Sequence, residues 1–206
     1  TYTYDDCKRL LEATNHDGIS YVTNTYDEAG RVITQDDAEE ETPLTLFEYM
    51  EEDEEGVFVS KATDRNGNQV SYHSDQRGRV RKMVDQNGNS TTYAYDEKGN
   101  CIQEENELGK KTTYEYDADS NITCMIDGYG YRTEMEYDQK GNLLKLTKPS
   151  GEVITYEYTP NNLLLTETNH AGIRTVYTYN ENAQVITESV SGLGVKYYTY
   201  TDGRLT

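Results

Sequence analysis

Residues 91–110, TTYAYDEKGNCIQEENELGK, decide the fold because they are one copy of a unit that recurs along the chain. A pair of mostly aromatic positions, two residues apart, returns every 21 residues from residue 93 onward. The regular copies are Tyr93/Tyr95, Tyr114/Tyr116, Met135/Tyr137, Tyr156/Tyr158, Tyr177/Tyr179 and Tyr198/Tyr200. Less evenly spaced copies are Tyr2/Tyr4, Asn24/Tyr26, Phe47/Tyr49 and Tyr72/Ser74. A fixed period of about 20 to 50 residues is typical of repeat architectures, so residues 1–206 are predicted to form a single array of about ten repeats.

Each unit is predicted to contain two antiparallel strands and two turns. Residues 91–96 alternate and are rich in Thr and Tyr, which is typical of a strand whose two tyrosines leave the same face. Residues 97–100 are polar and include Gly99, as a tight hairpin turn requires. A second short strand and a second glycine turn complete the unit. Gly fills the second turn more often than the first, so the second turn is predicted to be the stricter one.

The second strand of the unit begins with apolar residues. Six places after the aromatic pair stand Leu10, Val32, Val80, Cys101, Ile122, Leu143, Leu164 and Val185. The next place is also often apolar, with Leu11, Ile33, Ile102, Leu144, Leu165 and Ile186. Adjacent residues of a strand point to opposite faces, so we expect apolar surface on both faces of the sheet. That pattern suggests a second layer or a partner on the face opposite the tyrosines.

A sheet of this length is expected to coil. Ten repeats give roughly twenty strands, whereas open twisted sheets rarely exceed about ten strands without curling. Strand twist accumulates with one hand. We therefore predict an all-β fold, a repeat array of antiparallel β-hairpins that forms a long coiled, spiral and shell-like sheet. Each tyrosine hydroxyl within it needs a hydrogen-bond partner or water.

Two stretches lengthen the period without ending it. Tyr26 and Tyr49 are 23 residues apart, and the surplus lies near residues 38–43. Tyr49 and Ser74 are 25 residues apart, and the surplus lies in residues 50–56. Both surpluses are acidic, and insertions in repeats fall in loops. The acidic run from Glu51 to Glu55 is interpreted as a solvated loop, with a docking surface for a basic partner as the alternative.

The charge of the chain excludes several classes of partner. Its net charge is −19, its pI is about 4.4 and its mean hydropathy is −0.93. Contacts to phosphates need clustered Lys and Arg, so neither nucleic acid nor an anionic membrane surface is an expected partner. There is no apolar run of about 18 residues, so no membrane insertion is predicted. This composition alone would suggest disorder, but the 20 Tyr supply burial and strand propensity.

The three cysteines are Cys7, Cys101 and Cys124. They lack the spacing of a zinc site. Cys101 and Cys124 are expected on second strands with another strand between them, about 9 to 10 Å apart, which is beyond the roughly 7 Å that a disulfide tolerates. We therefore expect three free thiols, with Cys101 in a core position. Neither end of the sequence resembles a capping repeat, so we also expect a segment of a longer protein.

The unit resembles a known repeat. Residues 93–100, YAYDEKGN, and residues 135–143, MEYDQKGNL, follow the pattern Tyr-x-Tyr-Asp-x-x-Gly-(Arg/Asn)-(Leu/Val), as do residues 26–32 and 75–80 in part. This pattern is similar to the YD repeat of the Rhs family, and the resemblance covers nearly the whole chain. Departures stand at the Asp position, with Met50, Thr159, Asn180 and Thr201. The Asp-Pro motif of the family's self-cleavage region is absent from this sequence.

The resemblance implies a container rather than an enzyme. In that family the repeats build a hollow β-shell that encloses toxic C-terminal domains, and related shells occur in wall-associated proteins and in teneurins. It implies a bacterial protein that is secreted or at the cell surface, with the rest of the parent polypeptide and a possible C-terminal toxin cargo as partners. It implies no cofactor.

Two loops resemble the start of a calcium-binding loop. They are residues 64–68, DRNGN, and residues 85–89, DQNGN, with Asp75 and Asp96 eleven places after each first aspartate. Their flanks are predicted strands, and Asn-Gly is the usual pair of a hairpin turn. We therefore interpret both as turns and assign no metal ligand.

Catalysis and sugar binding are the remaining alternatives. His16 and His170 both stand two residues before a second-turn glycine and His73 lies elsewhere in the unit, so no nucleophile with a base is recognised and no catalytic residue is assigned. Exposed tyrosines could stack on carbohydrate, although the chain lacks the Trp of known sugar-binding repeats. The sequence therefore predicts a non-catalytic structural shell segment, with a carbohydrate-binding or cell-adhesion module as the alternative.

Overall fold

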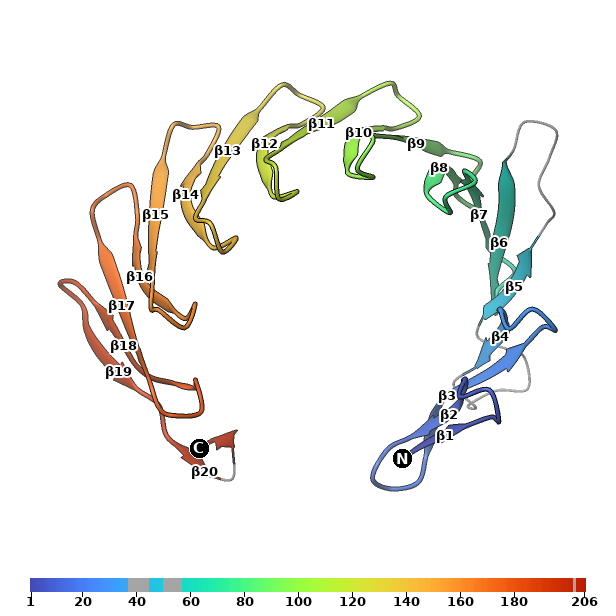
Figure 1. Ribbon diagram of the computed structural model, residues 1–206, viewed down its shortest axis with the longest axis horizontal. Coiled ribbons are helices and arrows are strands. Elements are labelled where there is room, and N and C mark those ends of the chain that lie inside the picture. Colours follow the sequence, from blue (N-terminus) through green and yellow to red (C-terminus); the bar gives the residue numbers. More distant parts are fainter. Residues whose placement is uncertain (37–44, 50–56, 202) are drawn as a thin grey trace. The chain divides into compact units, whose positions relative to one another are not determined.

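The computed structural model describes residues 1–36, 45–49, 57–201 and 203–206. The two acidic insertions predicted near residues 38–43 and 50–56 lie outside the described residues. Contacts along the chain define two compact units, Thr1–Lys110 and Lys111–Thr206, and each is described by itself. All regular structure in the described residues is β-strand (Figure 1).

In its described residues unit 1 contains ten strands, each paired antiparallel with the next in sequence. They are β1 (Tyr2–Tyr4), β2 (Leu10–Thr14), β3 (Ser20–Tyr26), β4 (Val32–Asp36), β5 (Thr45–Tyr49), β6 (Phe58–Asp64), β7 (Gln69–Ser74), β8 (Val80–Val84), β9 (Ser90–Tyr95) and β10 (Cys101–Glu105). The predicted array of hairpins is therefore present in this unit.

Unit 2 continues the same pattern through nine strands. They are β11 (Lys111–Tyr116), β12 (Ile122–Ile126), β13 (Arg132–Tyr137), β14 (Leu143–Thr147), β15 (Val153–Tyr158), β16 (Leu164–Thr168), β17 (Arg174–Tyr179), β18 (Val185–Val190) and β19 (Gly194–Tyr197). A separate small hairpin joins β20 (Tyr200–Thr201) to β21 (Arg204–Leu205). The sheet of this unit curves from β11 to β19 (Figure 1), and the predicted fold class is confirmed.

Both turns of a repeat have the same geometry. In the first turn, the Asp96 amide donates to the Asn100 carbonyl at 3.0 Å and the Gly99 amide donates to the Asp96 carbonyl at 3.2 Å. The second turn of the preceding repeat repeats these two bonds between Asp85, Gly88 and Asn89. This is a type I turn closed by a residue in the left-handed region, which suits the right-handed twist of the flanking strands.

The prediction that the second turn is the stricter one is confirmed. Gly88, in a second turn, has a φ of 83°. In the described residues, the left-handed place of some first turns is filled by residues with a side chain and a positive φ, namely Lys8, Ser120, Asn162 and Ala183. The second turns between residues 18 and 172 that the structure describes carry Gly at that place.

A β-bulge in the first hairpin of most repeats corrects the prediction about the two faces, and among the described residues the β5–β6 hairpin pairs without one. Cys101 pairs with Tyr95 and Gln103 pairs with Ala94, so Ile102 is an extra residue without an opposite partner. The same shift follows the first residue of β2, β4, β8, β12, β14, β16 and β18. The extra residue breaks the alternation of the strand.

The residue seven places after the aromatic pair is the extra residue of the bulge, and it therefore faces the tyrosines. Leu144 lines a hollow together with Tyr156 and Tyr158. The guanidinium carbon of Arg81, the equivalent residue of another repeat, lies 6.0 Å from the centre of the Tyr95 ring. The predicted apolar surface on the opposite face at this level is wrong, because both apolar residues at the start of the second strand serve the tyrosine face.

The structure has very little core. Among the described residues, only Ala13, Asn24, Cys124 and Thr166 are less than 9% exposed. The accessible surface is 13944 Å², whereas a compact monomer of 23.6 kDa exposes about 9,800 Å² by the usual scaling with mass. Each unit is therefore a single layer of sheet, and its cohesion depends on bonds between neighbouring repeats.

The cysteines are free, but their burial differs from the prediction. Cys101, expected in a core position, is half-buried, and Cys124 is 2% exposed. Cys124 lies on the face opposite the tyrosines, between its cross-strand partners Glu115 and Glu134. Burial raises the pKa of the Cys124 thiol, which keeps it neutral.

Candidate functional site

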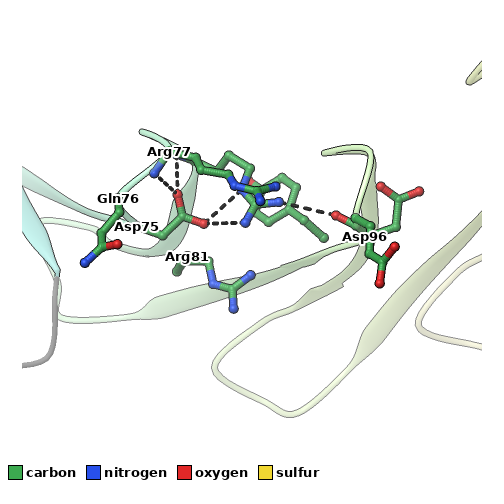
Figure 2. A pocket seen from close by; sticks show the side chains of 8 residues that line it. Asp75, Gln76, Arg77, Arg81 and Asp96 are labelled. Atoms are coloured by element: carbon green, nitrogen blue, oxygen red, sulfur yellow. Dashed lines mark hydrogen bonds and ion pairs between the residues drawn. The ribbon is translucent and has the colours of Figure 1, made fainter.

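A contact that recurs in several repeats ties a first turn to the tyrosine of the following repeat, and we call it the inter-repeat latch. One copy consists of Asp75, Arg79 and Tyr95. Figure 2 shows the Asp75 carboxylate with its bonds. Asp75 Oδ1 accepts hydrogen bonds from the amides of Arg77 and Arg79, both at 3.0 Å. Asp75 Oδ2 accepts from Arg79 Nε at 2.9 Å and lies 2.7 Å from Arg79 Nη2. The carboxylate thus holds its own turn and the arginine at once.

The arginine of the latch reaches the next repeat. The Arg79 guanidinium carbon lies 5.1 Å from the centre of the Tyr95 ring, within the range of a cation–π contact. Arg79 Nη1 donates to the carbonyl oxygen of Asp96 at 3.3 Å. The bond from the Arg79 side chain is the largest cause that lowers the pKa of Asp75 to about 2. Asp75 therefore stays ionised at neutral pH and cannot serve as a general acid.

The tyrosine hydroxyl closes the latch from the other side. Tyr95 Oη donates to the carbonyl oxygen of Val80 at 2.8 Å. Val80 is the first residue of β8, immediately before the extra residue of the bulge. The same bond occurs from Tyr26 to Leu10, Tyr49 to Val32, Tyr179 to Leu164 and Tyr200 to Val185, at 2.6 to 3.0 Å. These bonds supply the partner that the sequence required for the hydroxyls.

The latch is ionic at three first turns of unit 1, whereas at the Asp96 turn of the same unit Asn100 Nδ2 donates to Asp96 Oδ2 at 2.9 Å. Arg9 Nε donates to Asp5 Oδ2 at 2.6 Å, and its guanidinium carbon lies 4.6 Å from the centre of the Tyr26 ring. Arg31 repeats this arrangement with Asp27 at 2.7 Å and with the Tyr49 ring at 4.5 Å. An arginine four residues after the turn aspartate is thus clamped between a carboxylate and a ring.

Amide side chains replace arginine in unit 2. Asn142 Nδ2 donates to Asp138 Oδ2 at 2.8 Å and to Asn162 Oδ1 at 3.2 Å. Asn121 bonds Asp117 in the same way at 2.9 Å. The Asn ladder keeps the turn contact but lacks the charge and the cation–π contact of unit 1.

An open hollow lies beside the Asp75 latch (Figure 2). Its volume is about 830 Å³, and its lining consists of Asp75, Gln76, Arg77, Arg79, Arg81, Tyr95, Asp96 and Glu97. Three basic and three acidic side chains balance in charge, and Arg79 is already paired with Asp75. The lining contains no nucleophile next to a base, so the arrangement suits cohesion between repeats rather than chemistry.

The two loops that resemble calcium sites are turns. Asp64 Oδ1 accepts from the amides of Asn66 and Asn68, and Oδ2 accepts from Asn68 Nδ2, at 2.8 to 2.9 Å. Asp85 has the same bonds with Asn87 and Asn89. Each carboxylate is therefore used by its own turn. Nowhere in the described ranges do three or more His, Cys, Asp or Glu gather in a way that could hold a metal ion.

The three histidines have unrelated surroundings. His16 Nε2 lies 3.2 Å from Asp17 Oδ1 in a second turn, and both side chains are exposed. His170 Nε2 lies 3.7 Å from Glu152 Oε1, and Lys148 Nζ donates to Glu152 Oε2 at 3.1 Å. His73 lies within β7. The turn positions predicted for His16 and His170 are confirmed.

Sequence reasoning missed the latch, although its signal was present. Arg9, Arg31 and Arg79 each stand four residues after a turn aspartate, at Asp5, Asp27 and Asp75. The spacing indicates an ion pair across the turn. The contact with the following tyrosine is invisible in the spacing, because it depends on the way the next hairpin lies beside the turn.

Comparison with known proteins adds a family and a fold. The family model described as Teneurin YD-shell matches residues 68–206. No curated protein matches the chain in sequence. Within the described part of the chain, no helix is long and apolar enough to cross a membrane.

Several solved structures are similar over the whole length of the chain. A complex of TcdB2 and TccC3 matches with a TM-score of 0.62 and 16% identity, over 100% of this chain and 15% of that chain. The TcdB2–TccC3 structure without the hypervariable C-terminal region gives 0.62 and 16%, over 100% and 14%. A Photorhabdus luminescens Tc holotoxin pore gives 0.53 and 14%, over 99% and 14%. At such identities the likeness concerns the fold, and this chain spans about 15% of the length of these structures.

Proposed function

The chain belongs to the teneurin YD-shell family, and from this premise we propose that it is a non-catalytic wall segment of a shell that encloses or presents a C-terminal toxin or effector domain. Its role is mechanical: it extends a sheet by repetition and joins flanking repeats of the same polypeptide. The parent protein is proposed to be a large bacterial protein that is secreted or displayed at the cell surface.

The observation that carries the proposal is the inter-repeat latch. Tyrosine hydroxyls bond the preceding repeat in both units, as Tyr26 and Tyr179 illustrate. Each repeat therefore bonds its sequence neighbours, and the strand pairing follows the same rule. A structure held in this way can be lengthened without a central core, which is what a wall requires.

The cargo is inferred from the solved structures with the same fold. One of them is described as lacking a hypervariable C-terminal region, and another is a Tc holotoxin pore. We extend an enclosed C-terminal domain to the parent of this chain by that likeness.

Limited proteolysis of the full-length parent tests the proposal. The shell function predicts that a C-terminal domain following the repeats resists protease in the intact protein and is degraded when expressed alone. Electron microscopy of the same sample should show a hollow particle with density inside. A C-terminal region that is cut as fast in the intact protein as in isolation would refute enclosure.

A carbohydrate-binding or cell-adhesion module is the second candidate. Its support is the exposure of tyrosines such as Tyr129 and Tyr197, at 75% and 77%. A glycan array separates the two functions. Specific binding that disappears when exposed tyrosines are replaced would favour the module, and its absence favours the wall segment.

A further inference from the structure

An open hollow lies beside the first turn of residues 138–142 in unit 2. Its volume is about 460 Å³, and its lining includes Asp138, Asn142, Leu144 and Tyr158. It is the counterpart of the hollow beside the Asp75 latch, because Asp138 stands at the place of Asp75 in the repeat and Tyr158 stands at the place of Tyr95. As in the latch, the carboxylate belongs to one repeat and the ring belongs to the following one.

The two hollows differ in what covers the tyrosine ring. The guanidinium carbons of Arg79 and Arg81 lie 5.1 and 6.0 Å from the centre of the Tyr95 ring. In the 138–142 copy the corresponding residues carry no charge, and they are Asn142 and Leu144. No Arg or Lys of the described residues lies over the Tyr158 ring. This copy therefore has the ring of the latch without its cation.

The turn carboxylate can still accept a hydrogen bond. Asp75 Oδ2 is approached by two nitrogens of Arg79, Nε at 2.9 Å and Nη2 at 2.7 Å. Asp138 Oδ2 accepts one bond from within the described residues, from Asn142 Nδ2 at 2.8 Å. Asp138 Oδ1 accepts from the amides of Lys140 and Asn142. A carboxylate oxygen can accept about two hydrogen bonds, so Oδ2 has room for a second donor.

The carboxylate and the ring lie close enough to act together. Burial is the largest cause that raises the pKa of Tyr158, and the negative charge of Asp138 adds to it. Burial is also the largest cause that raises the pKa of Tyr95, and the charge of Asp75 is among those that add to it. The electrostatic relation between turn and ring is thus the same in both copies.

A backbone carbonyl completes the set of groups. Arg79 Nη1 donates to the carbonyl oxygen of Asp96 at 3.3 Å, and Thr159 stands at the place of Asp96 in the later copy. Lys140 does not take the place of the arginine, because its Nζ donates to the carbonyl oxygen of Pro160 at 2.9 Å. The three groups that bind Arg79 in the Asp75 latch therefore recur in this copy, where no side chain of the described residues uses them together.

We propose that Asp138, the Tyr158 ring and the Thr159 carbonyl form a docking site for an arginine side chain of a partner polypeptide. A guanidinium is planar and carries several donors, so it can lie over the ring while it bonds the carboxylate and the carbonyl. Leu144 and Tyr156, which line the same hollow, offer apolar contact to the stem of the arginine. The net charge of −19 attracts a basic partner and speeds its encounter. The site is independent of the proposed wall function.

Nuclear magnetic resonance of the 206-residue chain tests the site. The probe is a capped pentapeptide with two arginines. One control peptide carries lysine, which keeps the charge, and the other carries citrulline, which keeps the planar shape and removes the charge. The site predicts that the amide signals of residues 138–144 and 158–162 shift and saturate with the arginine peptide. Each control should bind about threefold more weakly or less, in line with the worth of a cation–π contact and a charged hydrogen bond.

A variant that fills the site from within the chain gives the sharpest comparison. Asn142→Arg places an arginine four residues after Asp138, as Arg79 stands after Asp75. Its own guanidinium should cover the ring and lower the affinity for the peptide about threefold or more. The control is Asn182→Arg, which adds the same charge at an exposed first-turn position of the same unit. It should leave the affinity within about twofold.

The reverse change should create a site in unit 1. Arg79→Asn combined with Arg81→Leu gives the Asp75 turn the residues of the 138–142 copy. The arginine peptide should then also shift the amide signals of residues 75–81 and 95–97, which it leaves in place in the unaltered chain. Unchanged signals outside the substituted turns establish that the variants are folded.

Four results would overturn the site. Shifts spread evenly over the acidic surface, or equal affinity for the lysine peptide, would mean that charge alone attracts the probe. Equal affinity for the citrulline peptide would mean that the cation is not recognised. Undiminished affinity in Asn142→Arg would place the binding elsewhere. A neutral oligosaccharide that shifts residues 138–144 while the arginine peptide does not would assign the hollow to carbohydrate.

Discussion

Substituting phenylalanine for tyrosine removes only the hydroxyl oxygen, so it distinguishes the contributions of the two tyrosines of a repeat to stability. Tyr95 Oη donates to the carbonyl of Val80 at 2.8 Å, whereas the hydroxyl of Tyr93, two residues earlier on the same face, makes no hydrogen bond within the described residues. Tyr95→Phe therefore deletes one bond between repeats and leaves the ring in place. Tyr93→Phe deletes a hydroxyl of the same kind without deleting a bond, and it serves as the matched control.

The expected loss follows from the net worth of one hydrogen bond. A neutral intramolecular bond contributes about 1 kcal/mol, and the orphaned Val80 carbonyl adds the cost of desolvation to the extent that water cannot reach it. We expect Tyr95→Phe to lower the free energy of unfolding by about 1 to 1.5 kcal/mol, and Tyr93→Phe by less than about 0.5 kcal/mol. For about 200 residues, the first value corresponds to a fall in Tm of roughly 2 to 6 °C.

Urea unfolding followed by far-UV circular dichroism measures both variants. Because arrays can unfold in parts, hydrogen exchange of the β8 and β9 amides should accompany it. The same comparison can be made with Tyr179→Phe, whose hydroxyl bonds Leu164 at 2.6 Å. Equal losses for Tyr93→Phe and Tyr95→Phe, or no loss for either, would show that the hydroxyl bonds do not hold the repeats together.

Three further predictions follow from the turns and the latch. Arg79→Lys keeps the charge but loses the planar group over Tyr95, so it should lower the Tm more than the same change at Arg77 in the same turn, Arg77→Lys. Equal Tm values would contradict the clamp. The pKa of Asp75 in the folded chain is about 2, below its value in the unfolded chain, so its contribution to stability is present above about pH 4 and is lost as the pH falls towards 2. Asp75→Asn should therefore remove that part of the fall in Tm at acid pH. An unchanged fall in Tm between pH 4 and pH 2 would contradict this prediction. Gly88→Ala, at a φ of 83° with open space around the new Cβ, should lower the free energy of unfolding in urea by about 1 kcal/mol. Ala183→Gly, at a φ of 60°, should raise it by up to about 1 kcal/mol. Effects of the opposite sign would refute the turn assignment.

The strands and turns could be predicted because their determinants are local. The alternation of residues 91–96 and the glycine of each turn set the hairpins before any tertiary contact forms. Even the tolerance of Ala183 and Ser120 at a left-handed place follows from the lesser use of Gly in the first turn.

The bulge and the latch escaped prediction because they depend on the partner strand. Leu143 and Leu144 look like an ordinary adjacent pair, and only the pairing of β13 with β14 reveals that Leu144 is the extra residue. The Arg31 side chain meets Tyr49 18 residues later, a contact that no short motif encodes.

Long-range backbone contacts in solution test the central claim most directly. If each unit is a single layer whose repeats bond their neighbours, nuclear Overhauser contacts should join Glu157 to Thr166 and Thr166 to Val176, following the register of β15, β16 and β17. Contacts in unit 2 should then be confined to strands that are adjacent in sequence. A network of contacts between strands two or more repeats apart within a unit, or the signals of helices, would contradict the account.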